Sequence, residues 1–279
     1  MNERNHSIKE DYYQFNEIRI HYRYAGDGNP VLLLHGWPTS SYLWRKVIKP
    51  LSKEHYIIAP DLAGFGLSDK PLNVSYNVEY HSTILNEFLN KLDVGKVDLV
   101  VHDLGGPIGL SWALQNRERI RRIIVLNTIL HPVSIGVKLF IIVARIKGIR
   151  NLLTSPWGIA KVMKFGVTNK KALTDEDIKV YQAPFTTKEE RKVLLKTLTD
   201  INPKVLEKIA KKLLDIDAPV RIIYGEKDPL LGVTRQMTYL KEKRPDIDIT
   251  VIPNCGHFLQ EDQPERLSKL LSEFLEATT

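Results

Sequence analysis

The sequence VVHDLGG places an acidic side chain, Asp103, where an apolar run ends and a helical pattern begins. A tight strand-turn-helix of this kind is typical of a nucleophile elbow, in which the nucleophile has a strained backbone conformation and small neighbours prevent clashes. Gly105 and Gly106 provide room after the turn, whereas Val101 is bulkier than the glycine often found two residues before the nucleophile. The alternative is that Asp103 only caps the helix. Its partners elsewhere in the sequence favour a carboxylate nucleophile.

A second acid and a base follow two later apolar runs. Asp228 lies in GEKDP directly after VRIIY, and His257 lies in NCGHF shortly after ITVI. In chain order, Asp103, Asp228 and His257 read nucleophile, acid and base, an order known for hydrolytic triads. Three such side chains, each just past a predicted strand, are much harder to obtain by chance than one loop histidine. Neighbouring Cys255 has no elbow around it, and we interpret it as structural.

The motif HGWP, residues 35–38, directly follows the apolar run VLLL. Backbone N–H groups at such a turn can stabilise negative charge that develops on an oxygen atom during the reaction. We therefore expect the N–H groups of Trp37 and Leu104 to form an oxyanion hole. The alternative is that HGWP is a plain turn at the end of a strand.

Short apolar runs alternate with helical patterns over most of the chain. Continuous apolar runs suit strands that are buried on both faces, so the alternation predicts a mostly parallel central sheet flanked by helices. The last helix is expected to begin near Pro264, which is a favourable first-turn residue. Between about residues 131 and 215 the strand patterns vanish, and amphipathic, lysine-rich helical patterns replace them. We predict an α/β core over residues 1–130 and 216–279, with a helical cap inserted at 131–215.

We expect the cap to lie over the Asp103 pocket. Parts of the apolar stretch LFIIV at 139–143, together with Tyr181 and Phe185, are candidates to line that pocket. The alternative is that these apolar residues only pack the cap on itself.

The composition indicates a globular protein, because 43% of its 279 residues are apolar and can form a sizeable core. No stretch approaches the roughly 20 apolar residues needed to cross a bilayer, so we expect no transmembrane segment. The polar start MNERNH lacks the apolar core of a secretory signal, and a cytoplasmic location is the default expectation. The single cysteine excludes an internal disulfide and a cysteine-based metal cluster.

The positive charge is concentrated in one segment. The chain has a formal charge of +7, while residues 131–213 hold 17 Lys and Arg against 7 Asp and Glu. This distribution indicates either ordinary solvated helix faces or an attraction for anionic substrates or a membrane surface. No zinc spacing or RNA-binding aromatic signature is present, so we expect no nucleic-acid partner.

The chain resembles the α/β-hydrolase superfamily over nearly its whole length. Within that superfamily it is similar to the branch with an aspartate nucleophile, the haloalkane dehalogenases and epoxide hydrolases. The stretches that carry the resemblance to dehalogenases are residues 35–45, 59–71 and 181–185. The resemblance implies an α/β-hydrolase fold with Asp103, His257 and Asp228 as the triad. Some dehalogenases have the acid after the sixth strand, but this chain has Asn127 there, so Asp228 is the better match.

The sequence departs from the dehalogenase pattern at two positions. Dehalogenases follow the nucleophile with a tryptophan whose indole N–H holds the leaving halide, and this chain has Leu104 there. They also commonly have asparagine after His-Gly, where this chain has Trp37, a choice more familiar in epoxide hydrolases. Trp37 and Trp157 are therefore candidate indole donors to a leaving group. Epoxide hydrolases use cap tyrosines to protonate the opening ring, and Tyr181 is the one tyrosine between residues 131 and 215.

A carboxylate nucleophile favours a reaction at an sp3 carbon. Attack by Asp103 would give an alkyl-enzyme ester. His257, oriented by Asp228, would then activate the water that hydrolyses it. This chemistry needs no metal or organic cofactor, only a small apolar organic substrate and water. Haloalkane dehalogenation is the main hypothesis, epoxide hydrolysis with Tyr181 as proton donor is the alternative, and a non-catalytic ligand-binding relative is less favoured because the triad is complete. The substrate itself and the oligomeric state do not follow from the sequence.

Overall fold

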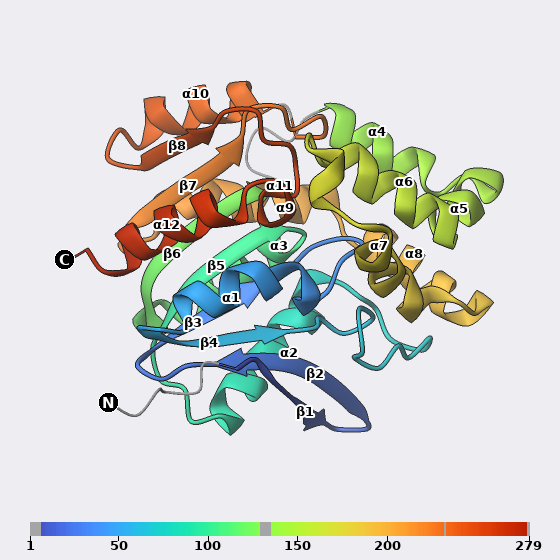
Figure 1. Cartoon of the computed structure of the whole chain (residues 1–279), viewed down its shortest axis with the longest axis horizontal. Helices are drawn as coiled ribbons and strands as arrows, with labels where there is room; N and C mark the ends of the chain where they lie inside the picture. The colour runs from blue at the N-terminus through green and yellow to red at the C-terminus, as the bar shows by residue number, and fades with distance from the viewer. Residues whose placement is uncertain (1–6, 129–134, 232, 278–279) are drawn as a thin grey trace.

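The computed structural model describes residues 7–128, 135–231 and 233–277. Eight strands form one sheet in the order β1-β2-β4-β3-β5-β6-β7-β8 (Figure 1). β1 pairs antiparallel with β2 and β2 antiparallel with β4, whereas every pairing from β4 through β3 to β8 is parallel. The prediction of a mostly parallel sheet is therefore confirmed. The strands are β1 (Lys9–Phe15), β2 (Ile18–Ala25), β3 (Asn29–Leu34), β4 (His55–Pro60), β5 (Val97–Asp103), β6 (Ile120–Thr128), β7 (Val220–Gly225) and β8 (Asp248–Ile252).

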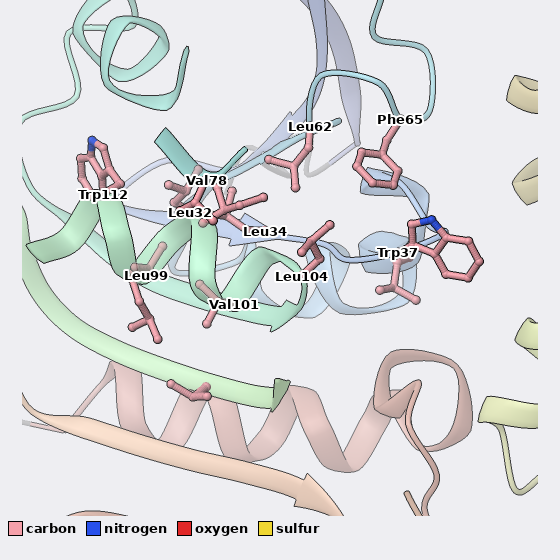
Figure 2. Packing of buried hydrophobic residues seen from close by; sticks show 14 of the residues in the cluster. Leu32, Leu34, Trp37, Leu62, Phe65, Val78, Leu99, Val101, Leu104 and Trp112 are labelled. Atoms are coloured by element: carbon pink, nitrogen blue, oxygen red, sulfur yellow. The ribbon is translucent and has the colours of Figure 1, made fainter. Parts of the chain in front are cut away.

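Helices cover both faces of the sheet, because successive strand side chains point to opposite faces and both sets are apolar. In β3, Leu32 and Leu34 belong to one apolar cluster, whereas Val31 and Leu33 belong to the other. Figure 2 shows the first cluster, with Trp112 of one covering helix among the strand side chains. The helices of the core are α1 (Arg45–Leu51), α2 (Val78–Lys91), α3 (Gly105–Gln115), α10 (Val233–Lys243), α11 (Leu259–Asp262) and α12 (Pro264–Leu275).

Between β6 and β7 the described residues contain helices and no strand, as the change in sequence pattern predicts. Several of these helices begin with strong local signals: Thr174 and Thr187 each form a capping box, and Pro156 stands in a first turn after the N-cap Ser155. The helices are α4 (Ile135–Val143), α5 (Lys147–Leu153), α6 (Pro156–Gly166), α7 (Asp175–Gln182), α8 (Lys188–Thr199) and α9 (Pro203–Lys212).

The last helix of this insertion differs from the others in its position. α9 packs against α3 and leads directly into β7, so it covers the sheet like a core helix. Helices α4 to α8 lie together at one end of the molecule, away from both chain termini (Figure 1). We call α4 to α8 the lid. The insertion between β6 and β7 therefore comprises the lid and one further helix, α9, that packs against the core. No helix among the described residues is long and apolar enough to cross a bilayer.

Candidate active site

The strained turn expected for a nucleophile elbow is present at Asp103. This residue ends β5 with φ of +48°, in the left-handed region that non-glycine residues rarely adopt, and α3 begins two residues later. A Cβ atom on Gly105 would clash with the carbonyl of His35, and one on Gly106 would clash with Thr128. The Thr128 hydroxyl donates a hydrogen bond to the Asp103 carbonyl. Glycine at both positions therefore allows this tight turn, and the neighbouring strand holds it.

The carboxylate of Asp103 is held by backbone donors. The Trp37 N–H donates to Oδ1 over 2.7 Å, and the Leu104 N–H also donates to the carboxylate. Gly36 must be glycine, since a Cβ there would clash with the same oxygen. Figure 2 shows Trp37 and Leu104 at the same end of the apolar cluster. The two N–H groups expected to form an oxyanion hole thus both lie against the Asp103 carboxylate.

His257 lies between the two acids. Its Nδ1 is 2.8 Å from Oδ2 of Asp228, and its Nε2 is 3.4 Å from Oδ2 of Asp103. The His257 side chain is 1% exposed and that of Asp103 is 16% exposed, so solvent reaches the Asp103 carboxylate and hardly touches the imidazole. The structure therefore brings the three predicted triad residues together at the carboxyl edge of the sheet, where ligands of α/β proteins bind.

The charges of the triad are coupled. Burial opposes protonation of His257, but the carboxylates of Asp228 and Asp103 outweigh it and raise its pKa to about 10. Burial would raise the pKa of Asp103, yet the hydrogen bond and charge of His257 hold it below its usual value. Asp228 follows the same pattern, helped by the N–H groups of Leu230 and Leu231. The resting site thus holds an imidazolium between two carboxylates.

A set of contacts that the sequence does not mark fixes the backbone of His257. Its carbonyl lies 2.9 Å from Nε2 of His102 and 3.1 Å from Nδ2 of Asn127, and its N–H donates to the Gly166 carbonyl over 2.6 Å. The Asn127 amide also donates to the Gly256 carbonyl and accepts from the Gly225 N–H. Asn127 therefore ties the loop of Asp228 to the loop of His257. A carboxylate at this position would have no proton for these two carbonyls.

The lid reaches this edge through aromatic and backbone contacts. The Trp37 indole N–H donates to the Leu194 carbonyl of α8 over 3.2 Å, and the Trp37 ring meets Phe140 of α4 edge-on with 5.8 Å between centroids. Ile141 is buried, whereas Leu139 and Ile142 are 56% and 60% exposed. Phe140 is thus the part of the stretch 139–143 that contacts a residue of the site, and Leu139 and Ile142 face outward.

The structure gives two predicted leaving-group residues other environments. Trp157 is 56% exposed, and the Lys161 ammonium lies 5.3 Å from its ring centroid, so it faces solvent on the outside of the lid. The Tyr181 hydroxyl donates to Glu261 over 2.6 Å. Burial and the charge of Glu261 raise the pKa of Tyr181 well above its usual value. Like the indole of Trp37, the Tyr181 donor is therefore already used within the protein.

Glu261 is the centre of an ion cluster between lid and core. Its fully buried carboxylate binds Arg45 through both oxygens, at 2.5 and 2.9 Å, and Lys46 at 2.9 Å, besides Tyr181. Arg45 also binds Asp177 of α7 at 2.7 Å. The cluster anchors α7 to the segment that follows His257. The described residues contain no group of three histidines, cysteines or acids that could hold a metal ion.

Comparisons with known proteins agree with this geometry. Residues 29–147 match the family model described as alpha/beta hydrolase fold. A haloalkane dehalogenase of Psychrobacter cryohalolentis is 33% identical over 97% of this chain and 91% of its own length. A soluble epoxide hydrolase of a Corynebacterium species is 29% identical over 90% and 91%. The structure of the haloalkane dehalogenase DatA from Agrobacterium tumefaciens covers 97% of both chains with a TM-score of 0.83 at 26% identity.

The chain belongs to the α/β-hydrolase superfamily. It is an enzyme of that superfamily, and its homologues include both haloalkane dehalogenases and epoxide hydrolases.

Proposed function

We propose that the protein hydrolyses a carbon–halogen bond at an sp3 carbon through an ester on Asp103. The observation that supports the proposal is that the two carboxylate oxygens of Asp103 have different partners. Oδ1 accepts the Trp37 N–H, while Oδ2 faces His257 with 3.4 Å between it and Nε2. Oδ2 is therefore the oxygen that is free to attack.

The reaction proceeds in two steps. In the first, a bond forms between Oδ2 and the substrate carbon, the carbon–halogen bond breaks, and halide leaves with the electron pair. In the second, water attacks the Asp103 carboxyl carbon and gives its proton to Nε2 of His257. The charge that develops on Oδ1 is stabilised by the N–H groups of Trp37 and Leu104. The Cγ–Oδ2 bond then breaks while Oδ2 takes the proton of the hydroxyl that water has added to Cγ, so the alcohol leaves with the former enzyme oxygen, Asp103 returns as a carboxylate and His257 remains protonated.

Alkylation itself prepares the base. Once Asp103 carries an alkyl group, it loses its negative charge, and one of the two acids that hold the proton on His257 is gone. The pKa of His257 therefore falls, and the imidazole can release its proton and accept one from water. The burial of His257 favours the same neutral form.

In this scheme the leaving group lies against apolar side chains. Leu104 has no side-chain donor and is 4% exposed within the apolar cluster, and the Trp37 indole is bound to Leu194. A halide that leaves without strong donors must carry its charge largely unaided, which disfavours poor leaving groups. We expect turnover to fall more steeply from iodide through bromide to chloride than in a dehalogenase with two indole donors.

The deciding experiment is a single turnover in ¹⁸O-water with 1,2-dibromoethane, with styrene oxide as the parallel substrate. An ester mechanism puts ¹⁸O into the Asp103 carboxylate, and mass spectrometry of the peptide detects it; label in the alcohol alone would refute the ester. Bromide release with little diol from styrene oxide supports dehalogenation. The reverse result would assign epoxide hydrolysis, with a proton donor other than the Tyr181 hydroxyl.

A further inference from the structure

The outer side of the lid carries an unusual concentration of exposed apolar side chains. Twelve large apolar residues are exposed among the described residues, and seven of them lie within α4 to α6 and their junctions. We call these seven the lid patch: Leu139, Ile142, Ile146, Ile149, Leu152, Trp157 and Phe165. Clustered exposed apolar residues mark interaction surfaces, whereas scattered ones do not.

The helix α4 shows that the patch is not the ordinary outside of an amphipathic helix. Its sequence is IGVKLFIIV, with Val137 and Ile141 buried toward the protein and Leu139 and Ile142 exposed on the other side. A helix that is apolar all round is normally covered on all sides. On α6, Trp157 and Phe165 stand eight residues apart, and Lys161 between them lies on the same face. The outer face of α6 therefore combines two large apolar side chains with a cation.

The charge around the patch is mostly positive. Residues 119–174 contain eleven Lys and Arg and no Asp or Glu, and six of these cations fall within 135–166. A groove of about 530 Å³ beside α5 and α8 adds further cations. It is lined by Leu72, Arg150, Asn151, Thr154, Lys188, Arg191, Lys192, Leu195 and Lys196. At the far end of α6, Lys164 pairs with the exposed Asp175 at 3.3 Å. The surroundings of the patch are therefore strongly positive.

We propose that the lid patch binds the surface of an anionic lipid bilayer. Apolar side chains that enter the boundary between headgroups and acyl chains, with cations beside them, are the features that hold a protein on such a surface. Trp157 lies at the position of an interfacial anchor, with an apolar ring and a polar N–H. A second copy of this chain fits less well, because a symmetric contact would bring two cationic patches together without acids to pair them.

The chain carries its own probe for this contact. Of its four tryptophans, Trp37, Trp44 and Trp112 are buried, and Trp157 is exposed. Changes in tryptophan emission at a lipid surface therefore report on the patch. The full chain is mixed with vesicles of phosphatidylcholine alone or of phosphatidylcholine with phosphatidylglycerol, and bound protein is also measured by sedimentation. We expect a blue shift, protection from iodide quenching and co-sedimentation with the anionic vesicles, all weakened by salt.

Two matched pairs of variants separate charge from apolar contact. Lys147→Glu with Lys161→Glu should weaken binding by at least about a hundredfold, since each charge near an anionic surface contributes about fivefold. Lys91→Glu with Lys96→Glu, at two exposed lysines outside the lid, changes the net charge equally and is its control. Phe165→Ser should weaken binding at least about tenfold, whereas Val251→Ser on the exposed side of β8 should not. Thermal unfolding checks that the variants are folded.

Several outcomes would overturn the proposal. Equal binding to neutral vesicles, or equal binding by the doubly charge-reversed variant and wild type, would remove the electrostatic argument. A shift of tryptophan emission with inorganic phosphate alone would indicate that the cations bind a free anion and not a lipid surface. Protection of Trp157 that increases with protein concentration, without lipid, would identify the patch as a contact between copies of the chain.

Discussion

The core and the lid contribute to the active site in different ways. Among the described residues, the donors directed at Asp103 come from the core: the N–H groups of Trp37 and Leu104, and His257. The polar groups of the lid near the same edge bind the protein itself, as the Leu194 carbonyl and the Tyr181 hydroxyl do. The core therefore defines the bond-making chemistry. The lid supplies apolar surroundings. Which leaving groups react should therefore depend on the reactivity of the carbon–halogen bond itself.

The largest effect should come from the nucleophile. Asp103→Asn keeps an oxygen for the Trp37 N–H and tolerates positive φ, so the fold should survive while turnover falls by at least about 10⁴-fold. Bromide release and thermal unfolding are the measurements. Activity near that of the wild type would remove Asp103 from the mechanism, and with it the whole contrast between core and lid.

Substitution of His257 should separate the alkylation of Asp103 from the hydrolysis of the ester. In His257→Gln the first step does not need a base, so the alkyl-enzyme ester should accumulate while turnover drops by about 10³-fold or more. Intact-protein mass spectrometry should show the added alkyl group after incubation with 1,2-dibromoethane. The double variant with Asp103→Asn is the control and should show no adduct. An inert single variant without an adduct would place His257 in the first step.

Substitution of Asn127 tests whether a single side-chain amide of the core, through its contacts with the loop of His257, affects the rate of the reaction. Asn127→Ala leaves the carbonyls of Gly256 and His257 without one donor and should slow ester hydrolysis by about 10–100-fold. The pre-steady-state burst of bromide should persist, because alkylation does not depend on this support. Asn116→Ala is the matched control, because it removes a hydrogen bond from a side-chain amide to the Trp112 carbonyl outside the site. A proportional loss of both steps would indicate a structural role only.

The pH dependence should differ between the steps. Asp103 has a lowered pKa, so it is ionised throughout the neutral range and the burst should be independent of pH there. His257 starts protonated below a pKa of about 10 and must lose its proton in the alkylated enzyme. Ester hydrolysis should therefore rise with pH, by up to about tenfold per unit, and level off below pH 10. Stopped-flow measurement of both phases gives the two profiles; a hydrolysis rate that falls with rising pH would contradict this scheme.

The smallest catalytic effect is expected on the lid side. Tyr181→Phe removes a buried hydrogen bond to Glu261 and should lower the free energy of unfolding by about 1–3 kcal/mol. Bromide release should change by less than about twofold, because the hydroxyl is bound to Glu261 and takes no part in the proposed steps. A large loss of diol formation in this variant would restore Tyr181 as a proton donor and give the lid a chemical role.

The sequence predicts that Asp103, Asp228 and His257 meet, because parallel strands end at one edge of the sheet. Asp103, Asp228 and His257 each follow a strand-like run, so the topology alone brings them together. The glycines of the elbow add a steric signal that is visible in the sequence. The same logic predicts the parallel sheet and the start of the last helix at Pro264, which the structure confirms.

The sequence predicts the lid less well for a physical reason. The direction in which a lid side chain points depends on the rotation of its helix, which packing sets and spacing alone does not. Trp157 and Tyr181 therefore could not be placed, and α9 could not be told from a lid helix. The support of His257 was also hidden, because its partners include backbone carbonyls, which every residue type has. The exposed edge strand β1, with its mixed polar sequence, gives little signal of its own.

The contact between Gly166 and His257 has a consequence for engineering this enzyme. The end of α6 accepts the N–H of His257, and the next residues, Thr168 and Asn169, donate to Asp262 of the core. A graft that exchanges the whole insertion between relatives would thus also exchange part of the scaffold beneath the base. A donor cap should keep this stretch as it is, with the crossover points placed on either side of it. The segment that can be exchanged between relatives is therefore shorter than the whole insertion between β6 and β7.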